Sequence, residues 1–523
     1  MSALSSPPDL MLARVSLFAA LIASPALAQE TFVVTTTANS GAGSLSQAIT
    51  DANRSRNAAA GPDRIEFAIP GDGPYTIQPN FELPAVTEAV VLDGLTQPGA
   101  DCSAWPATLM IELDGQRTGF EGDGLAFESG GGSTVRGLVV NRFQGDGFDV
   151  KGSGGNTFEC NYVGTDVTGR LARPNGDDGI DVESPGNVIG GPAPSARNLI
   201  SGNGNDGIDI DGSGVDADGN VLQGNYIGVA VDGTSPLGND DEGIELQFGA
   251  SGTLVGGTGP GEGNVIAFND GNGVKVEASS SVRNSILGNA MFGNGERGIE
   301  LQEGVRGEQT ANDSGDRDSG PNNLQNYPVL TAARTAANTS ATTVEGTIDS
   351  APNTTFRIEL FANGRPDADG FGPGETFVGA LEVATDADGD ADFSIALSER
   401  IEAGTFVTAT ATDAEGNTSE FSQGLEVVAQ NNVSAEGPAE RDRRITLAPN
   451  PAGDAVAVSF DLEDGSPIEV VVVDVLGRVV RAQTSRAGQR ALVLDVSGVP
   501  PGAYVVRVTS GATSRTARFT VAR

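Results

Sequence analysis

Six charged residues recur at one position of a repeat and could act together in chemistry. Each stands two places after a glycine and between two apolar residues; they are Asp149, Asp181, Asp209, Glu245, Lys275 and Glu300. If the repeats stack as strands, neighbouring members lie roughly 5 Å apart. Carboxylates at that spacing repel one another, raise one another's pKa and favour a bound cation. A calcium-dependent polysaccharide lyase would use such a cluster to hold a metal on an acidic sugar.

A lysine or arginine would have to act as the base in such a lyase. We therefore name Asp209, Glu245, Lys275 and Arg297 as the catalytic candidates. The competing interpretation is a solvated acidic face selected for solubility. The chain has 70 acidic against 31 basic residues and a formal net charge of −39, so we favour the solvated face. The same charge repels nucleic acid and anionic membranes, and we expect no nucleic-acid partner.

The chain contains no histidine and only two cysteines. This composition excludes Ser-His-Asp triads, histidine bases and thiolate zinc clusters. Calcium is the one cofactor that we name, because carboxylates are its usual ligands. Asp313, Asp316 and Asp318, in a polar loop, are the metal-site candidate. Their order is not that of an EF-hand, because the closing glutamate is missing.

The repeat itself predicts the architecture. Variants of Gly-Ile-Asp-Val begin at glycines 147, 179, 207, 243, 273 and 298. A longer pattern that begins at residue 156 occurs a second time from residue 220. Repetition at this scale indicates a solenoid. The alternation of apolar and polar residues after each glycine indicates strands. We predict an all-β fold built on a right-handed parallel β-helix, since crossover connections between parallel strands are right-handed. Leucine-rich repeats are disfavoured because there is no regular leucine frame.

Asparagines occupy equivalent turns of the repeat. Asn156 corresponds to Asn220, and Asn161 corresponds to Asn225. Asparagine tolerates the left-handed backbone of tight corners. Stacked asparagines could also form hydrogen-bonded ladders. We favour these structural roles over a role in binding.

The segments on either side of the repeat have other patterns. Residues 29–328 are assigned to the β-helix with an N-terminal cap, in which Ser44 and Gln47 have the spacing of a capping box for a short helix. Residues 329–428 have longer alternating strands separated by turns, which indicates an immunoglobulin-like β-sandwich. Residues 429–443 are polar and are assigned to a linker.

The first residues have the pattern of an export signal. Arg14 precedes the apolar run 15–23, and Ala26 and Ala28 form a small-x-small cleavage site. We therefore assign residues 1–28 to a signal peptide. The run is too short to span a membrane, and we expect no transmembrane segment.

The last residues resemble a known sorting domain. The segments 447–452, 474–480, 494–508 and 519–523 resemble motifs of the C-terminal sorting domain of the type IX secretion system, over about residues 444–523. The resemblance implies a small β-sandwich and a partner in the type IX secretion machinery. It also implies passage across an outer membrane, often with removal of the domain and attachment at the cell surface.

A second resemblance concerns the N-terminal cap. Residues 35–53 resemble the opening of a family of bacterial surface β-helix proteins, which supports the architecture more than any activity.

Sugar platforms favour exposed aromatic residues, and Trp105, Tyr162 and Tyr226 are the candidates for glycan contact. We favour packing roles for the two tyrosines.

Cys102 and Cys160 could form a disulfide in an exported chain or remain two buried thiols.

We expect a secreted or surface-attached β-helix scaffold that is structural, adhesive or glycan-binding, with an extracellular polysaccharide or surface glycan as its partner. The alternative is a calcium-dependent polysaccharide lyase or another carbohydrate-active enzyme.

Overall fold

The structure is a computed structural model. It describes residues 29–119, 122–128, 130–213, 217–302, 307, 309–336, 341–430, 445–460, 467–474, 478–486, 489–510 and 513–522. The predicted signal peptide and most of the predicted linker lie outside the described residues. The chain divides after Gln430 into two compact units, and each is described by itself.

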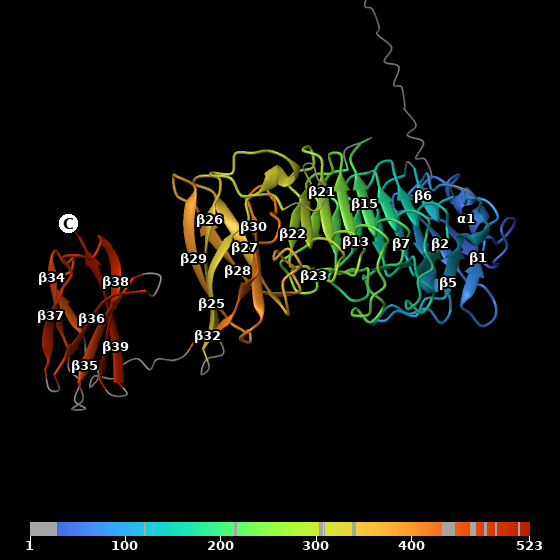
Figure 1. Cartoon of the computed structure of the whole chain (residues 1–523). Helices are drawn as coiled ribbons and strands as arrows, with labels where there is room; N and C mark the ends of the chain where they lie inside the picture. The colour runs from blue at the N-terminus through green and yellow to red at the C-terminus, as the bar shows by residue number, and fades with distance from the viewer. Residues whose placement is uncertain are drawn as a thin grey trace, which may run out of the picture. The chain divides into compact units, whose positions relative to one another are not determined.

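Three parallel sheets run along most of the first unit, and successive turns of the chain add one short strand to each (Figure 1). The first sheet contains β1 (Thr31–Val34), β2 (Asp63–Phe67), β4 (Val90–Asp93), β7 (Thr134–Arg136), β10 (Thr157–Glu159), β13 (Val188–Gly190), β16 (Val221–Gln223), β19 (Leu254–Gly256) and β22 (Ser285–Leu287). The second sheet contains β3 (Tyr75–Ile77), β5 (Ile111–Asp114), β8 (Leu138–Asn141), β11 (Tyr162–Val163), β14 (Leu199–Ile200), β17 (Tyr226–Ile227), β20 (Val265–Ala267) and β23 (Ala290–Phe292). The third sheet contains β6 (Leu125–Phe127), β9 (Phe148–Val150), β12 (Ile180–Val182), β15 (Ile208–Asp211), β18 (Ile244–Gln247), β21 (Val274–Glu277) and β24 (Ile299–Gln302).

This arrangement is the predicted β-helix, with three strands in each coil. The apolar residues of each strand stack in register, as Ile180, Ile208 and Ile244 do on the third sheet. All three are fully buried in one continuous core of Val, Ile, Leu and Phe. Strand alternation therefore fixes which side chains fill the solenoid and which line its outer faces.

Buried asparagines form the predicted ladders between coils. Asn161, Asn198, Asn225, Asn264 and Asn289 follow one another, and each of the first four donates its side-chain amide and its backbone N–H to the next side-chain oxygen. A second ladder joins Asn156, Asn187 and Asn220. A third, which the sequence analysis missed, joins Asn175, Asn203, Asn239, Asn269 and Asn294. These bonds satisfy polar groups that the solenoid corners would otherwise bury unpaired.

The N-terminal end of the solenoid is covered by the predicted helix, α1 (Leu45–Ala52). Ser44 caps it by accepting a hydrogen bond from the backbone N–H of Gln47 at 3.2 Å. Leu45, Ala48 and Ile49 are buried against the first coils. Three short 3-10 turns also occur in the first unit, η1 (Gly94–Thr96), η2 (Gly115–Arg117) and η3 (Pro321–Leu324).

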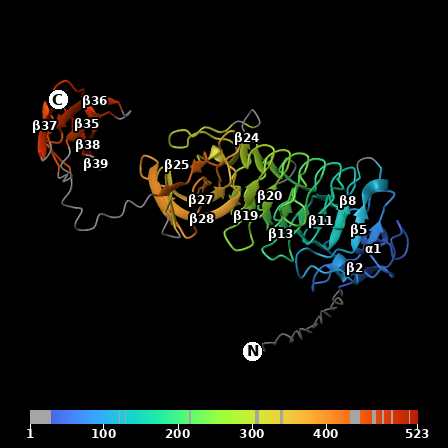
Figure 2. The ribbon, with the colours of Figure 1, turned by 60° about the horizontal axis from the view of Figure 1, so that its bottom comes forward.

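The other end meets an immunoglobulin-like sandwich of two four-stranded sheets. One sheet contains β25 (Val329–Ala336), β26 (Thr342–Asp349), β29 (Asp390–Leu397) and β32 (Val428–Gln430). The other contains β27 (Thr355–Asn363), β28 (Thr376–Ala384), β30 (Phe406–Thr412) and β31 (Leu425–Glu426). Figure 2 shows this sandwich directly against the last coils of the solenoid. Phe361 and Phe421 of the sandwich belong to the solenoid core.

The sandwich gives each of the three sheets a hydrogen-bond acceptor at its last strand. Ile286 on the first sheet donates its backbone N–H to Thr418 Oγ1 at 2.9 Å, and Met291 on the second sheet donates to the Gly374 carbonyl at 2.8 Å. On the third sheet, Leu301 donates to Glu420 Oε1 at 3.0 Å. The sandwich therefore pairs backbone groups that an open solenoid end would leave exposed.

The second unit is a small β-sandwich with its own apolar core. One sheet contains β33 (Thr446–Ala448), β34 (Ala455–Ser459) and β37 (Ala491–Asp495). The other contains β35 (Ile468–Val473), β36 (Val479–Ser485), β38 (Gly502–Ser510) and β39 (Thr513–Val521). No described helix of the chain is both long enough and apolar enough to cross a membrane.

Candidate functional site

The charged column predicted from the sequence forms along the third sheet. Pairing between adjacent strands aligns Asp149 with Asp181, then Asp209, Glu245, Lys275 and Glu300 in unbroken succession. Each member projects away from the core, because the apolar residues before and after it face inward. Parallel strands lie about 4.8 Å apart, so the column is a closely spaced line of carboxylates with one lysine in it.

A second acidic line, missed in the sequence analysis, runs beside the first. Its members directly precede the repeat glycines, and they are Asp123, Asp146, Asp178, Asp206 and Glu242. Each of the first four carboxylates accepts a hydrogen bond from the backbone N–H of the next coil's member, and Glu242 accepts from the backbone N–H of Asn272. Asp178 Oδ1, for example, lies 2.8 Å from the backbone nitrogen of Asp206. The sequence signal for this line is the acidic residue that directly precedes each of these five glycines.

The column is buried more deeply than a solvated face would be. Asp149, Asp209, Glu245 and Lys275 are each less than 10% exposed, and Glu300 is 1% exposed. Our expectation of a solvated face was therefore wrong for most of this column. The reason is geometric, because side chains of adjacent coils cover one another along the sheet and the second acidic line covers one flank.

Burial strongly perturbs these carboxyls. Desolvation, followed by the charges of neighbouring carboxylates, raises the pKa of Asp209 to about 9 and the pKa of Asp181 to about 8. Desolvation is also the largest cause at Asp178 and Asp146, where it raises the pKa to about 7 and about 9. In the fold, each of these carboxyls is therefore more stable when it binds a proton or a cation than as a bare carboxylate.

Lys275, the candidate base, is held in ion pairs. Its Nζ lies 2.7 Å from carboxylate oxygens of both Glu245 and Glu277 and 3.9 Å from Glu242. Burial alone would lower the pKa of Lys275, but the hydrogen bonds and charges of its glutamate partners hold that pKa above its ordinary value. A general base works best with a pKa near the operating pH, and this environment moves Lys275 the other way.

Arg297, the other candidate base, lies where the solenoid meets the sandwich. Its guanidinium is 3.4 Å from Glu300 and 2.8 Å from Asp369, and it also bonds to Gln309. Its side chain is 11% exposed. Arg297 and Asp369 line a cavity of about 310 Å³ between the last coil and the sandwich. Two coils, those of β18 and β21, lie between Asp209 and Arg297. Arg297 instead belongs to the junction between the solenoid and the sandwich.

The predicted metal-site residues do lie together. Carboxylate oxygens of Asp313, Asp316 and Asp318 lie within 4.8 Å of one another. Asp316 accepts hydrogen bonds from two side chains. Ser350 Oγ donates from the sandwich, and Gln325 Nε2 donates from the segment just before the sandwich. Burial is the main reason that its pKa rises to about 6. Carboxylate oxygens of Asp146, Asp177 and Asp178, beside the third sheet, also lie within 4.8 Å of one another.

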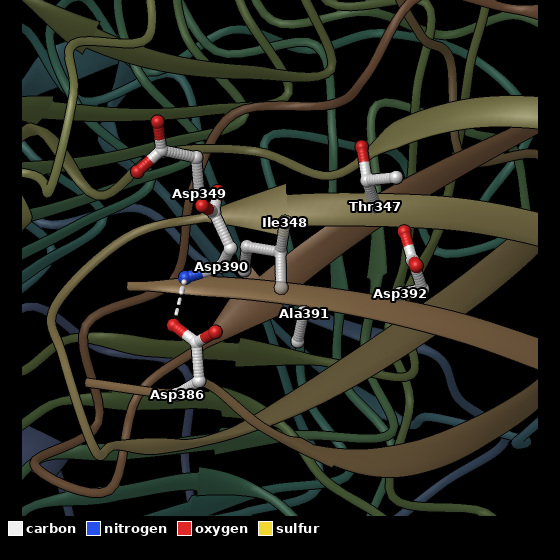
Figure 3. A pocket seen from close by; sticks show the side chains of 7 residues that line it. All are labelled: Thr347, Ile348, Asp349, Asp386, Asp390, Ala391 and Asp392. Carbon is white, nitrogen blue, oxygen red and sulfur yellow. Dashed lines mark hydrogen bonds between the residues drawn. The ribbon is translucent and has the colours of Figure 1, made fainter. Parts of the chain in front are cut away.

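A neighbouring acidic pocket of about 390 Å³ lies on the sandwich (Figure 3). Asp349, Asp386, Asp390 and Asp392 contribute its carboxylates. Asp386 accepts hydrogen bonds from the backbone N–H groups of Asp388 at 2.9 Å and Asp390 at 3.1 Å. These bonds lower the pKa of Asp386 and belong to the polar turn that connects β28 of one sheet to β29 of the other.

The candidate aromatic residues pack together on the outside of the second sheet. Tyr162 is 1% exposed, and the Trp105 ring meets the Tyr162 and Tyr226 rings edge-on at 5.6 and 5.4 Å. The Arg197 guanidinium covers the Tyr226 ring at 4.1 Å. This packing leaves no open stacking platform on Tyr162.

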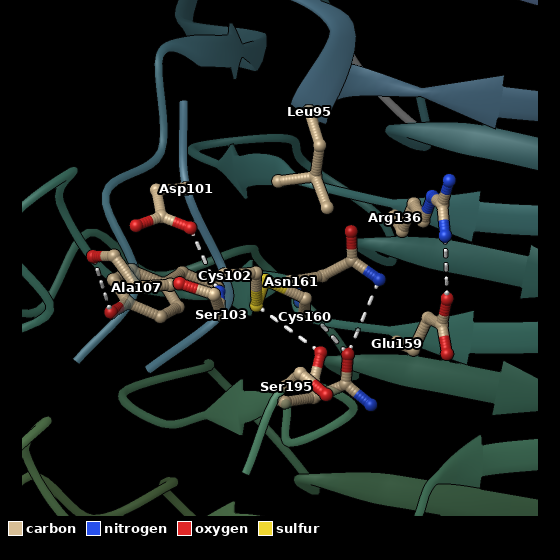
Figure 4. The surroundings of a disulfide bond; sticks show 12 residues. Leu95, Asp101, Cys102, Ser103, Ala107, Arg136, Glu159, Cys160, Asn161 and Ser195 are labelled. Atoms are coloured by element: carbon tan, nitrogen blue, oxygen red, sulfur yellow. Dashed lines mark hydrogen bonds and ion pairs between the residues drawn. A yellow bond between two sulfur atoms is a disulfide. The ribbon is translucent and has the colours of Figure 1, made fainter. Parts of the chain in front are cut away.

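A disulfide fastens the loop that carries Trp105. Cys102 and Cys160 are bonded in this structure, with their Cα atoms 6.5 Å apart, and Figure 4 shows the bond beside Asn161 of the ladder. The indole Nε1 of Trp105 donates to the Val231 carbonyl at 2.7 Å. The loop is therefore anchored at two points, at the corner between β10 and β11 and in the loop that follows β17.

Three of the solved structures that match the chain resemble it only faintly. A biofilm-associated protein BSP domain is 16% identical over 38% of this chain, with a TM-score of 0.16, and the match spans only 30% of that structure. The fibronectin(III)-like modules of Clostridium thermocellum CbhA are 16% identical over 37% of this chain and 90% of theirs, with a TM-score of 0.15. Dimeric latent PorU from Porphyromonas gingivalis is 13% identical over 43% of this chain and 22% of its own, with a TM-score of 0.13. TM-scores this low carry no argument about fold or function. No curated protein matches the chain significantly.

The second unit gives a definite match. Residues 446–522 match the family described as the secretion system C-terminal sorting domain. This agrees with the resemblance seen in the motifs of the sequence. The chain therefore carries a type IX sorting domain, which implies recognition by the type IX secretion machinery and export across the outer membrane to the cell surface or the medium.

Proposed function

We propose that residues 29–430 form a non-catalytic extracellular scaffold that the sorting domain delivers to the cell surface. Its role there is structural or adhesive, with glycan binding as one form of adhesion. In this proposal residues 1–28 are a signal peptide, residues 29–328 the capped β-helix and residues 329–428 the sandwich. Residues 429–443 then act as the linker to the sorting domain at 444–523.

One observation carries the proposal. Both side chains that the sequence analysis named as candidate bases, Lys275 and Arg297, are buried in ion pairs. The Lys275 side chain is buried and has two carboxylate partners at 2.7 Å. Arg297 is held by Glu300 and Asp369 at the end of the solenoid. Lyase chemistry needs a base that can reach a substrate proton, and these contacts favour a structural role for both residues.

A polysaccharide panel tests the proposal against the lyase alternative. Purified residues 29–430, one compact unit, are incubated with uronic-acid and neutral polysaccharides, with calcium and with chelator. Chain cleavage is followed by the ultraviolet absorbance of unsaturated ends, and binding is followed by retention on the polymer. The variant Lys275→Gln is run alongside.

The outcomes separate the alternatives. Retention without cleavage supports a glycan-binding scaffold, and neither retention nor cleavage supports a structural or protein-adhesive scaffold. Calcium-dependent cleavage that Lys275→Gln abolishes would overturn the proposal and establish the lyase alternative.

A further inference from the structure

The chain has two lysines, and both form ion pairs with the acidic column of the third sheet. Lys275 stands in register with Glu245, because its strand β21 pairs in parallel with β18. The Lys275 Nζ atom lies 2.7 Å from Glu245 Oε1. The two side chains are 10% and 11% exposed, so water has little access to the contact. An amine and a carboxyl group from adjacent coils are therefore held together away from solvent.

A third carboxyl group lies beside this pair. Glu242 is fully buried, and its Oε1 atom is 3.9 Å from Lys275 Nζ. Its other oxygen accepts a hydrogen bond from the backbone N–H of Asn272, which fixes the carboxyl group in place. Proton transfer needs about 2.6–3.2 Å or one bridging water, so a small rotation of the Lys275 side chain or a single water closes the gap. Glu242 can therefore carry protons between the two reacting groups.

Lys275 has another carboxylate partner, which is less suited to react. Glu277 Oε2 also lies 2.7 Å from Lys275 Nζ, but the Glu277 side chain is 30% exposed. Water stabilises the ionised form of an exposed carboxyl group, and a carboxylate resists attack by an amine. Burial disfavours the ionised form, so Glu245 is the better target of the two.

We propose that Lys275 and Glu245 condense to an isopeptide bond that joins two adjacent coils of the solenoid. The Lys275 nitrogen attacks the Glu245 Cδ atom, so that one C–N bond forms and one C–O bond breaks. Two of the three ammonium protons leave on the expelled carboxyl oxygen as one water molecule, and Glu242 carries them between the atoms. The step consumes no oxidant, reductant or cofactor.

The ion pair is the state from which the reaction starts. The glutamate partners hold the pKa of Lys275 above its ordinary value, so the amine carries its proton most of the time. Transfer of that proton to Glu245 gives a neutral amine beside a neutral carboxyl group, without changing the net charge of the site. Burial disfavours both charges of the pair and so brings the neutral form closer in free energy. The neutral form needs to react only once, because the amide persists.

Lys151 has ion pairs but lacks this environment. Its Nζ lies 3.2 Å from both Asp149 and Glu183, and its side chain is 42% exposed. No third carboxylate of the described residues lies within ion-pair distance of it. Lys151 therefore stays a free amine and is a control within the same molecule.

The bond extends the scaffold role, and it does not depend on what the scaffold binds. Each coil contributes only short strands, such as the four-residue β18 and β21. A covalent tie between these strands would hold their coils together even when the hydrogen bonds between them open. The disulfide of Cys102 and Cys160 already supplies such a tie nearer the N-terminal end.

Trypsin digestion of the reduced chain from Gln29 to Arg523, followed by mass spectrometry, tests the bond. Trypsin cleaves after a free lysine, and an amide on the lysine nitrogen blocks the cleavage. We therefore expect cleavage after Lys151 and no cleavage after Lys275.

The masses of the peptides identify the reaction. A free Lys275 gives the separate peptides 198–275 and 276–283. The bonded form gives one uncleaved peptide, 198–283, which is about 18 Da lighter than its sequence because amide formation by the lysine expels one water. Cleavage after Lys275, or a peptide 198–283 of full mass, would overturn the proposal.

A second digest identifies the partner. Cleavage before aspartates separates residues 241–269, which contain Glu245, from residues 270–312, which contain Lys275 and Glu277. A bond to Glu245 keeps these two peptides joined. A bond to Glu277 would lie within 270–312 and would overturn the assignment.

Two variants complete the test. Lys275→Arg keeps the positive charge and should restore the cleavage and the full mass. Glu242→Gln keeps both bonding partners but removes the proton carrier, so the lighter peptide should form about a hundredfold more slowly after purification. Equal rates in the wild type and Glu242→Gln would overturn the role of Glu242. The digests of the wild type decide the bond itself even if a variant does not fold.

Discussion

Replacing Phe421 by alanine tests whether the sandwich stabilises the solenoid. The Phe421 ring is 4% exposed and belongs to the solenoid core, although the residue itself lies in the sandwich. It meets the Phe361 ring edge-on at 5.3 Å, and a Cβ atom on Gly298 of the last coil would lie 2.7 Å from it. The ring therefore closes the open end of the core.

The expected loss follows from this burial. Removing a fully packed phenyl ring costs about 3–5 kcal/mol, as the sum of lost transfer free energy and the cavity left behind. The upper part of that range applies if the Gly298 and Gly374 backbones cannot collapse into the space. Phe377→Ala is the matched control, because Phe377 lies in the same sandwich and is 41% exposed. Its loss should be well below that of Phe421→Ala.

The single tryptophan makes the assay specific. Trp105 packs on coils of the solenoid, against Tyr162 and Tyr226, so its fluorescence reports on the solenoid and not on the sandwich. In urea unfolding of residues 29–430, we expect the Trp105 transition and the far-ultraviolet circular dichroism transition to move together for Phe421→Ala. An unchanged Trp105 transition, with or without a shift in circular dichroism, would refute the idea that the sandwich caps the solenoid cooperatively.

Buried groups of the solenoid give three further predictions, which concern Thr253, the disulfide and Asp209. Thr253 stands where the ladder after Asn220 needs its next asparagine, and its buried Oγ1 has no hydrogen-bond partner among the described residues. Thr253→Asn should add two hydrogen bonds and raise the unfolding free energy by about 1–3 kcal/mol in urea titrations, whereas Thr253→Val should have little effect. Replacing both Cys102 and Cys160 by serine should lower the unfolding free energy by up to about 4 kcal/mol, because the bond closes a loop of 58 residues. Reduced wild type should match this variant, and a difference between them would show that the serines act in another way. The unfolding free energy should fall as pH rises from about 4 to about 9, because Asp209 and Asp181 bind protons in the folded state that the unfolded chain has released. Melting temperatures that rise over this range would contradict the raised pKa values.

Local pattern predicted most of the fold. The capping residue Ser44, the alternation of each repeat and the stacked asparagines all appear in the structure as expected. In the sandwich, the longer alternating strands expected over residues 329–428 are present, as in β26, whose residues alternate between buried and half-buried. These features depend on neighbours in sequence or on a fixed repeat, so their physical cause is visible in the chain itself.

Contacts between distant segments could not be predicted in this way. Glu420 accepts from the backbone N–H groups of Leu301 and Thr310, more than a hundred residues earlier in the chain. Nothing in the pattern around Glu420 indicates that it is buried against the last coil. The burial of Lys275 was equally hidden, because it depends on which side chains of adjacent coils reach across it.

The sandwich has the strand pattern of an independent module, yet its contacts make it part of the solenoid. Glu359 is fully buried and accepts from the backbone N–H of Gly288 at 2.8 Å, and Glu420 does the same for Leu301. Burial raises the pKa of both carboxyls, and that of Glu420 reaches about 7. A freely tethered binding module would keep such charged groups in water. Their placement against the last coil therefore argues that the solenoid and the sandwich serve as one scaffold, and that binding sites should be sought on its outer faces.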